Sequence, residues 1–306
     1  MNVNPAFSRF SELLGASRFA VTAEIAPPAS ADPKVLLERA LPLRGLADAV
    51  NVTDGAQARA SMSALAAAAI LAQNGIEPIL QMSCRDRNRI ALQSDLLGAA
   101  ALGIRNLLML RGDDPSAGDQ ADAKPVFDLD TQALAATAAT MRDRGELPSG
   151  RALQDRPAFF IGATDSPLDP VPGWKPDRLR AKLDAGVQFV QTQFCMDVGI
   201  LTRYLGRLAD EGIGENLFVL VGIAPLASAR SAHWMRENLP GVIIPETTVR
   251  RLEQAAEPKA EGQRICVELM HELSELKGVA GVHVMAPRNE SAIAPTIADF
   301  RKSRTG

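Results

Sequence analysis

Residues 78–111, PILQMSCRDRNRIALQSDLLGAAALGIRNLLMLR, contain the pattern that decides the fold class. An apolar run at 78–82 precedes a helical stretch at 88–102, and after Gly103 a second apolar run occupies 106–111. Short apolar runs between turn signals are typical of strands buried on both faces of a parallel sheet. Glycine directly after a helical stretch is a common terminator, because it adopts the left-handed conformation without strain. The stretch predicts a strand–helix–strand unit with parallel strands.

The same alternation continues along the chain. Strands are expected at 19–24, 49–53, 78–82, 106–111, 158–162, 189–193, 217–221 and 281–285. Helices are expected at 34–40, 63–73, 88–102, 131–144, 176–185, 199–211, 228–238, 246–254, 261–277 and 291–301. About eight strand–helix units in 306 residues are typical of a (β/α)8 TIM barrel, so we predict this α/β fold as a single catalytic domain over residues 1–306. A doubly wound open sheet is the competing architecture.

Residues 1–17 are expected to form a short helical extension before the barrel. Phe7, Phe10, Leu13 and Leu14 recur at helical spacing. This apolar face either caps the bottom of the barrel or contacts another subunit, and we expect the cap.

Composition and charge exclude several classes of protein. A net charge of -3 gives no electrostatic footprint for nucleic acid or for an anionic membrane. Cys84, Cys195 and Cys266 are widely spaced without a C-x-x-C, which argues against a disulfide framework or a zinc site. The start lacks the pattern of a secretory signal, and the apolar run 64–72 is too short to span a bilayer. We therefore expect a cytoplasmic protein with no nucleic-acid partner, no membrane partner and no metal.

In a TIM barrel the reactive groups lie at the carboxyl ends of the strands, and this rule selects candidates. They are Glu24, Thr53, Asp54, Gln81, Ser83, Arg111, Asp113, Gln193 and His283. Common cofactor and nucleophile motifs are missing from the sequence: no G-x-G-x-x-G follows a strand, and no P-loop or G-x-S-x-G is present. No Lys ends an expected strand, which argues against a Schiff-base aldolase.

Glu24 is the most informative candidate, because it ends an apolar strand before two prolines. A carboxyl group in apolar surroundings retains its proton, which suits a general acid near neutral pH. The alternative is a structural carboxylate paired with an Arg.

The other candidates have equally open interpretations. Arg111 and Gly112 suit a phosphate contact, or they belong to an ordinary loop. Gln193 hydrogen-bonds a heterocycle or braces a loop. Cys84 and Cys195 follow strands and could supply a thiolate, although small buried packing residues are commoner.

Several motifs in a fixed order resemble those of methylenetetrahydrofolate reductases. The first is Glu24-Ile-Ala-Pro-Pro28, which resembles the E-x-x-P-P that ends the family's first strand. The most specific is Cys84-Arg-Asp-Arg-Asn88, which resembles the bacterial branch that is also found fused to homocysteine methyltransferases. The remaining motifs are Asn51-Val-Thr-Asp-Gly55, Arg111-Gly-Asp113, Lys124-Pro-Val-Phe-Asp128, Asp184-Ala-Gly186, Thr192-Gln193, Gly222-Ile-Ala-Pro225 and Gly281-Val-His283. The resemblance covers roughly residue 19 to the end.

The resemblance implies a TIM-barrel oxidoreductase of one-carbon metabolism and methionine biosynthesis. The reaction would be the reduction of 5,10-methylenetetrahydrofolate to 5-methyltetrahydrofolate. The implied cofactor is a non-covalent flavin, FAD, which NADH or NADPH and the folate visit in turn. The implied assembly is a homodimer or homotetramer.

The resemblance also implies roles for individual residues. Glu24 matches the general acid, and Asp113 matches the second catalytic carboxylate, near pterin and flavin. The implied substrate-binding residues are Gln193, Asp113, Gly222 and His283. The implied flavin-binding residues are Thr53, Gln81, Ser83, Arg111, Gly112, Ala163 and Lys182, with Lys182 at the phosphates.

The sequence departs from the family pattern around the presumed flavin face. Gln81 replaces a His, Ile25 and Ala26 replace aromatic residues, and Phe194-Cys195 replaces Phe-Phe. The single Tyr of the chain is Tyr204, so the loop at 112–130 offers no Tyr to stack on a flavin. These departures motivate an alternative, a folate-binding or partner-dependent barrel without a functional flavin site. A different flavin barrel, such as a proline dehydrogenase, has no positive sequence feature.

Overall fold

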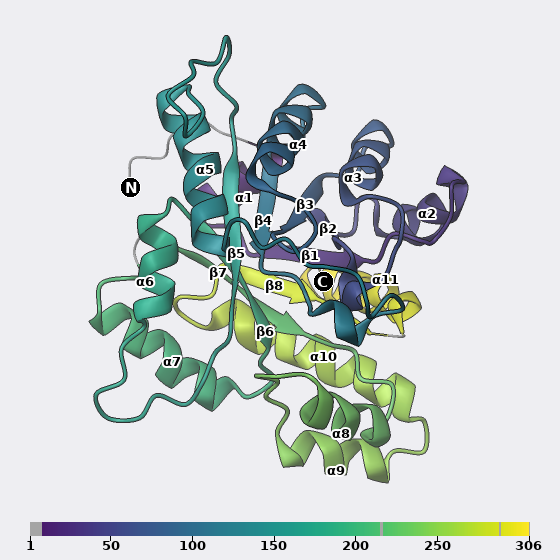
Figure 1. Cartoon of the computed structure of the whole chain (residues 1–306). Coiled ribbons are helices and arrows are strands. Elements are labelled where there is room, and N and C mark those ends of the chain that lie inside the picture. Colours follow the sequence, from purple (N-terminus) through teal and green to yellow (C-terminus); the bar gives the residue numbers. More distant parts are fainter. Residues whose placement is uncertain (1–7, 215–216, 288, 306) are drawn as a thin grey trace.

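The computed structural model describes residues 8–214, 217–287 and 289–305, and its core is a closed barrel of eight parallel strands (Figure 1). The strands are β1 (Ala20–Ile25), β2 (Ala49–Val52), β3 (Pro78–Ser83), β4 (Asn106–Leu110), β5 (Phe160–Asp165), β6 (Phe189–Phe194), β7 (Phe218–Ile223) and β8 (Gly281–Val284). β1 pairs with β8, which closes the barrel. The predicted TIM barrel is confirmed, and the open-sheet alternative is wrong.

Helices surround the barrel and agree with the predicted ones to within a few residues at their ends. They are α1 (Arg9–Gly15), α2 (Pro33–Ala40), α3 (Ala64–Gln73), α4 (Arg89–Ala101), α5 (Thr131–Arg144), α6 (Asp177–Asp184), α7 (Val198–Asp210), α8 (Ala229–Asn238), α9 (Glu246–Gln254), α10 (Pro258–Glu275) and α11 (Ile293–Thr305). Short side chains fix where helices begin. The Asp32 carboxylate accepts from Lys34 N at the start of α2, and Asn88 Oδ1 accepts from Ile90 N at the start of α4.

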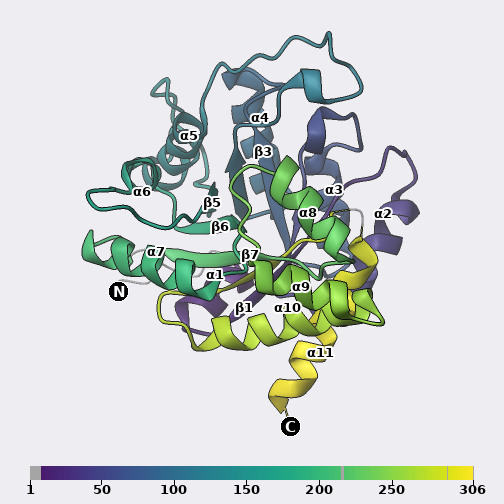
Figure 2. The same cartoon turned by 90° about the horizontal axis from the view of Figure 1, so that it is seen from below.

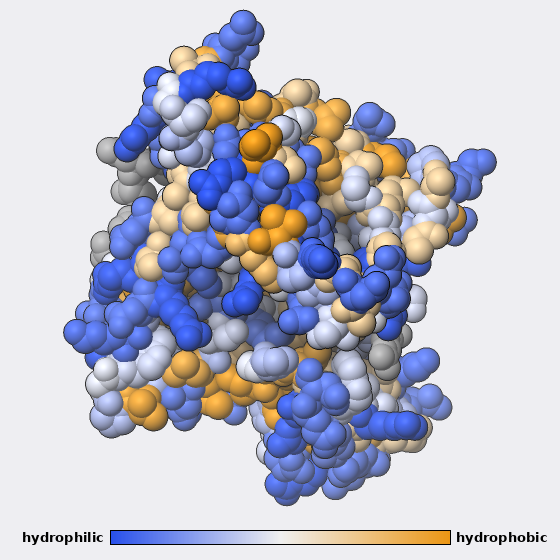
Figure 3. Space-filling view, viewed as in Figure 1, coloured by the Kyte–Doolittle hydropathy of each residue, from blue (hydrophilic) through white to orange (hydrophobic). Residues whose placement is uncertain are grey.

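Two helices, α8 and α9, are inserted between β7 and α10. α9 packs against α10, and α8 packs against α9 (Figures 1 and 2). The connection between α8 and α9 pairs with the main chain at the end of β6. Met196 N donates to Ile243 O and Ile243 N donates to Phe194 O, both at 2.8 Å. The surface over α8 and α9 is mainly hydrophilic (Figure 3). The insertion therefore adds a polar cover beside the carboxyl end of β6.

The interior of the barrel begins with an apolar layer at the amino ends of the strands. Its members are Ala20, Ala49, Ile79, Leu108, Phe160, Phe189 and Leu220. Phe10 of α1 closes this layer, since its ring meets Phe160 and Phe189 edge-on at centroid distances of 5.8 and 5.5 Å. Phe10 is fully buried, so the predicted cap is confirmed for the described part of α1, while Phe7 lies outside the described residues.

A second core lies between the barrel and the helices. Alternate residues of each strand point outward into it, for example Val50 and Val52 of β2. No described helix is long and apolar enough to cross a membrane.

Candidate active site

A buried polar layer lies above the apolar layer, one step further along the strands. Its members are Thr22, Asn51, Gln191 and His283, each no more than 2% exposed. Asn51 Nδ2 donates to Gln191 Oε1 at 2.6 Å, and Gln191 Nε2 donates back to Asn51 Oδ1 at 3.0 Å. A buried amide is costly unless its groups are paired, so this reciprocal pair fixes both side chains.

His283 is held from below by this layer. Its Nδ1 lies 2.9 Å from Thr22 Oγ1 and 3.4 Å from Gln191 Nε2. With the ring proton on Nε2, Nδ1 can accept from the Thr22 hydroxyl. That Nε2 faces the carboxylate of Glu24, 3.7 Å from Oε2.

Glu24, near the end of β1, lies where the polar layer meets the barrel mouth. Gln81 Nε2 of β3 donates to Glu24 Oε2 at 2.8 Å, and 28% of the Glu24 side chain remains exposed. No Arg forms an ion pair with Glu24 in the described part of the chain, so the structure does not support the paired-Arg alternative there. Glu24 is thus accessible to a ligand, held by the Gln81 amide and faced by the His283 ring.

A second carboxyl group lies near Glu24. Burial raises the pKa of Glu290, Arg39 at 3.7 Å opposes this shift, and the charge of Glu24 adds to it. Glu290 belongs to the short 3-10 helix η4 (Glu290–Ala292), and Arg39 Nη1 also donates to Ala26 O at 3.0 Å. Sequence reasoning missed both residues, because neither ends a strand.

Arg111, Gly112 and Asp113 lie in the loop that follows β4. The Arg111 guanidinium stacks over Phe127, with its Cζ 5.1 Å from the ring centroid. The exposed Asp113 carboxylate accepts from Gln57 N at 2.7 Å, which ties this loop to the loop after β2. The two loops carry η3 (Pro115–Ala117) and η2 (Ala56–Ala58), which lie side by side in both views (Figures 1 and 2).

The ends of β2 and β3 are joined beneath these loops. Asp54 accepts from Ser83 N at 2.7 Å and pairs with Arg87, which also donates to Asp95 at 2.7 Å. Thr53 is buried directly after β2. Ser83 Oγ is buried and has no partner among the described residues.

Lys182 and Ala163 lie on the β5 side of the barrel. Lys182 Nζ of α6 donates to Thr164 O at 2.5 Å and lines a cavity of about 520 Å³ beside Trp174 and Arg178. Burial lowers the pKa of the Lys182 amine, and Asp165 opposes that shift. The Ala163 methyl is buried in the outer core, so its side chain offers no polar group to a ligand.

Gln193 and Gly222 form hydrogen bonds with neighbouring protein groups. Gln193 Nε2 donates to Pro240 O at 3.2 Å and its Oε1 accepts from Phe194 N at 3.0 Å, as expected for a loop brace. Gly222 N donates to Thr192 Oγ1 at 2.9 Å, and a Cβ at Gly222 would collide with Thr192 O. The register shift in β6 between Gln191 and Phe194 brings these strands together.

Cys84 and Cys195 are buried packing residues. Burial raises the pKa of each thiol to about 11, so a thiolate is disfavoured near neutral pH. This supports the packing interpretation over the nucleophilic one.

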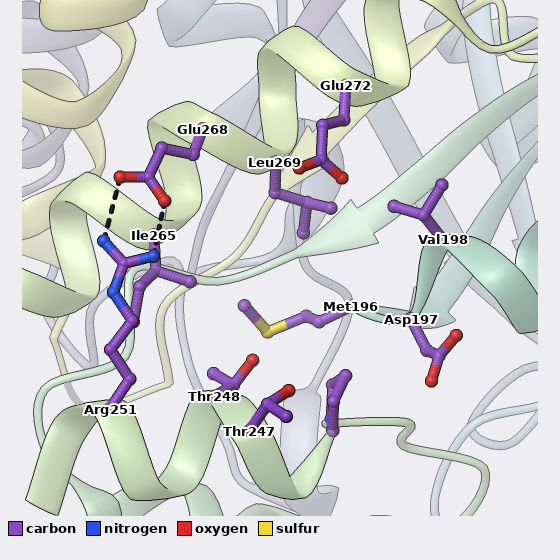
Figure 4. Close-up of a pocket in the computed structure, with 11 residues that line it drawn as sticks. Met196, Asp197, Val198, Thr247, Thr248, Arg251, Ile265, Glu268, Leu269 and Glu272 are labelled. Atoms are coloured by element: carbon purple, nitrogen blue, oxygen red, sulfur yellow. Dashed lines mark hydrogen bonds and ion pairs between the residues drawn. The ribbon is translucent and has the colours of Figure 1, made fainter.

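A second cavity of about 340 Å³ lies outside the barrel wall between the start of α7, α9 and α10 (Figure 4). Its Arg251 is neutralised by Glu268, with N–O distances of 2.5 and 2.8 Å. Thr247 and Thr248 line its floor near Met196. None of the predicted site residues lines this cavity.

Two observations fit a flavin dinucleotide at the predicted positions. The unpartnered Ser83 hydroxyl supplies a hydrogen-bonding group at the end of β3. Lys182 lines a cavity together with Lys175, Arg178 and Trp174, which can contact a phosphate or a ring, and with the carboxylates of Asp165 and Asp177.

Comparison with known proteins identifies related chains. A profile of the family described as methylenetetrahydrofolate reductase matches residues 9–300. A curated protein of Caenorhabditis elegans, named a probable methylenetetrahydrofolate reductase (NADPH), is 25% identical over 243 residues, which are 77% of this chain and 34% of that protein. The chain thus spans about a third of the length of this relative.

Two solved structures share the fold. An uncharacterized protein from Clostridium thermocellum, described as binding two copies of 5-methyl-5,6,7,8-tetrahydrofolic acid, has a TM-score of 0.65 and 14% identity, covering 96% of this chain and 99% of that chain. DmoA from Hyphomicrobium sulfonivorans has a TM-score of 0.54 and 10% identity, covering 93% and 88%. Likeness at such identities establishes the barrel alone.

Proposed function

The chain belongs to the methylenetetrahydrofolate reductase family, and on that premise we propose that it reduces 5,10-methylenetetrahydrofolate to 5-methyltetrahydrofolate with a hydride from NADH or NADPH. The observation that carries the proposal is Glu24, half-buried at the barrel mouth between Gln81 and His283. A folate substrate also accords with the Clostridium thermocellum barrel, which is described as binding 5-methyl-5,6,7,8-tetrahydrofolic acid.

Glu24 supplies the proton that the reaction needs. Its carboxyl group donates a proton to one bridge nitrogen, the bond from that nitrogen to the methylene carbon breaks, and an iminium ion forms with the other nitrogen. A hydride then adds to the methylene carbon and gives the methyl group. The resulting Glu24 carboxylate accepts hydrogen bonds from Gln81 Nε2 and, when the site tightens, from His283 Nε2, which lies 3.7 Å away.

Asp113 and the opposite side of the mouth orient the pterin in this proposal. Asp113 presents its carboxylate at the exposed edge, and Gln193 offers its amide once it exchanges its loop contact for the ligand. Gly222 pairs with His283 across β7 and β8, and the absence of a side chain there lets the chain of Thr192 pack closely beside it. Preorganised polar groups of this kind select the reacting geometry.

A flavin, when bound, would carry the hydride between the nicotinamide and the folate. The residues that would hold it are Thr53, Gln81, Ser83, Arg111, Gly112, Ala163 and Lys182. Ser83 would donate from its free hydroxyl, and Lys182 would neutralise a phosphate. Ala163 could contribute only its main chain, because its methyl is buried.

The visible spectrum of the purified protein tests this proposal. With FAD added under anaerobic conditions, we expect a flavin band that NADH or NADPH bleaches and 5,10-methylenetetrahydrofolate restores. A band that the nicotinamide bleaches but the folate fails to restore would contradict the proposed substrate.

A second candidate is a folate-binding or partner-dependent barrel without a functional flavin site. Arg111 is stacked on Phe127, and the one Tyr, Tyr204, is buried in α7 against Asp165. Arg111 is thus engaged by Phe127, and the burial of Tyr204 leaves no exposed Tyr among the described residues to stack on a flavin. Tight binding of 5-methyltetrahydrofolate with no flavin band in excess FAD would select this candidate. A cytoplasmic location and a homodimer or homotetramer remain predictions in either case.

A further inference from the structure

The Cys84–Asn88 motif contains a buried cation that the proposed chemistry does not use. Arg85 is only 4% exposed. Its guanidinium makes a two-pronged pair with Asp86, with Nε at 2.7 Å and Nη2 at 2.8 Å from the carboxylate oxygens. A buried guanidinium is costly unless its donors are satisfied, so its remaining contacts identify what it holds in place.

The third nitrogen of Arg85 joins two loops of the barrel mouth. Nη1 donates to Gly55 O at 3.1 Å, in the loop after β2, and to Asp113 O at 3.4 Å, in the loop after β4. The main chain adds a third tie, because Val126 N donates to Arg85 O at 2.7 Å. One residue therefore fixes the loops after β2 and β4, which flank β3, and the far end of the longer loop.

Two glycines show that the loops are shaped around this side chain. Gly55 and Gly112 have φ of +59° and +91°, a region that favours glycine. A Cβ at Gly112 would lie 2.9 Å from Arg85 Cβ, and a Cβ at Gly55 would press on the Arg85 guanidinium. Neither loop could keep its path if these positions carried a side chain.

The same contacts determine where the Asp113 carboxylate points. Its Oδ2 accepts from Gln57 N at 2.7 Å, and Gln57 has a φ of +56°, which is unfavourable for a residue with a Cβ. Such a conformation persists only where neighbouring contacts enforce it. Arg85 holds Gly55, two residues before Gln57, and it holds the carbonyl group of Asp113 itself.

We propose that Arg85 is a positioning residue for the folate site, which holds the loops after β2 and β4 together so that Asp113 meets the pterin. This inference rests on the proposed function. Arg89, the residue after this motif, provides a matched contrast, since it is exposed and pairs with Asp128 at 2.7 Å on the surface.

Steady-state kinetics and folate binding of R85A, R85K and R89A test the proposal in the full chain. We expect R85A to lower kcat/KM for 5,10-methylenetetrahydrofolate on the order of 100-fold, the effect of a misplacement of about 1 Å. R85K keeps the charge but cannot span Asp86 and two carbonyl groups, so it should recover little. Oxidation of NADH by an artificial acceptor should fall much less than folate activity in R85A and R85K, and R89A should resemble wild type throughout.

Rescue separates positioning from a general structural role. Added guanidinium ion should restore part of the folate activity of R85A and none to R85K, whose ammonium still fills the site. If R85A does not fold, G55A keeps Arg85 but displaces its guanidinium, and it should show the same selective loss. Wild-type folate kinetics in well-folded R85A would overturn the inference. If the wild-type protein neither binds 5-methyltetrahydrofolate nor reduces 5,10-methylenetetrahydrofolate, the proposed function is wrong. The inference about Arg85 is then wrong as well, because there is no folate site for Arg85 to position.

Discussion

His283 Nε2 lies 3.7 Å from Glu24 Oε2, while Nδ1 of the same ring lies 2.9 Å from Thr22 Oγ1. The ring thus connects the buried polar layer to Glu24 at the barrel mouth, which Gln81 also contacts. In the tautomer with its proton on Nε2, the ring presents a donor to Glu24. This relationship makes Glu24 a carboxyl group whose charged form can be stabilised after it gives up a proton.

Glu24→Gln should remove folate reduction while sparing oxidation of the nicotinamide. Glutamine is nearly isosteric and can still contact Gln81, but it has no acidic proton to donate. We expect the folate half-reaction to slow by about 100-fold to 10,000-fold, the usual contribution of a general acid. Rapid-mixing measurement of each half-reaction is the check, and equal loss in both would refute the assigned role.

His283→Ala should slow the folate half-reaction by at least about tenfold, since a hydrogen bond to a charged group is worth about 1.5–3 kcal/mol. H283Q should retain more activity, because its amide can still donate toward Glu24. Thr22→Val is the comparison variant: it removes the contact at Nδ1 but keeps the ring that faces Glu24, so it should slow the folate half-reaction less than H283A does. A folate rate in H283A equal to that of wild type would mean that the ring only fills the barrel.

The fold could be predicted from the sequence because its signals are local. Each strand is a short apolar run, and each following helix has a terminator within a few residues, as at Gly103 and Gly145. The cap by Phe10 was also predictable, because helical spacing marks an apolar face that must be buried. β5 runs further than predicted, to Asp165, because Thr164 and Asp165 still pair with β6.

The site was only partly predictable, because barrel closure decides which side chains meet. Asn51 and Gln191 are 140 residues apart, and each looks like an isolated polar residue in an apolar run. Strand ends identified Glu24 and Gln81, but the contact between them depends on the barrel interior. Successive side chains of a strand point to opposite faces, and Gly162 faces the Phe189 ring inside the barrel. The alternation along β5 could therefore have predicted that Ala163 points outward. Nothing in the spacing indicates that Arg85 is buried and Arg89 exposed.

Phe10→Ala should destabilise the barrel by about 3–5 kcal/mol, because it removes a fully buried ring from the bottom layer. Denaturant unfolding followed by circular dichroism gives the free energy of unfolding. R9A, the neighbouring position, loses only an exposed contact with Glu77 and should change stability by less than about 1 kcal/mol. Similar values for the two variants would contradict the cap.

The cysteines should resist alkylation in the native protein. Burial raises the pKa of Cys84 and Cys195 to about 11, so at pH 8 only about one thiol in a thousand is ionised, and the side chains are also inaccessible. Mass spectrometry after treatment with iodoacetamide should find these thiols unmodified until denaturant is added. C195S should keep its folate activity. Rapid labelling of the native protein, or loss of activity in C195S, would reopen the thiolate interpretation.

Lys182→Met should weaken flavin binding by about 10-fold to 100-fold, because a charge-assisted hydrogen bond to a phosphate contributes about 1.5–3 kcal/mol. Burial lowers the pKa of the Lys182 amine, so its charged form is lost at a lower pH than for an ordinary Lys. FAD affinity should therefore fall as the pH rises through that lowered pKa, and K182M should lack this fall. Lys175→Met, at the exposed edge of the same cavity, is the control. Quenching of FAD fluorescence gives both affinities, and an FAD affinity in K182M equal to that of wild type at every pH would place the phosphates elsewhere.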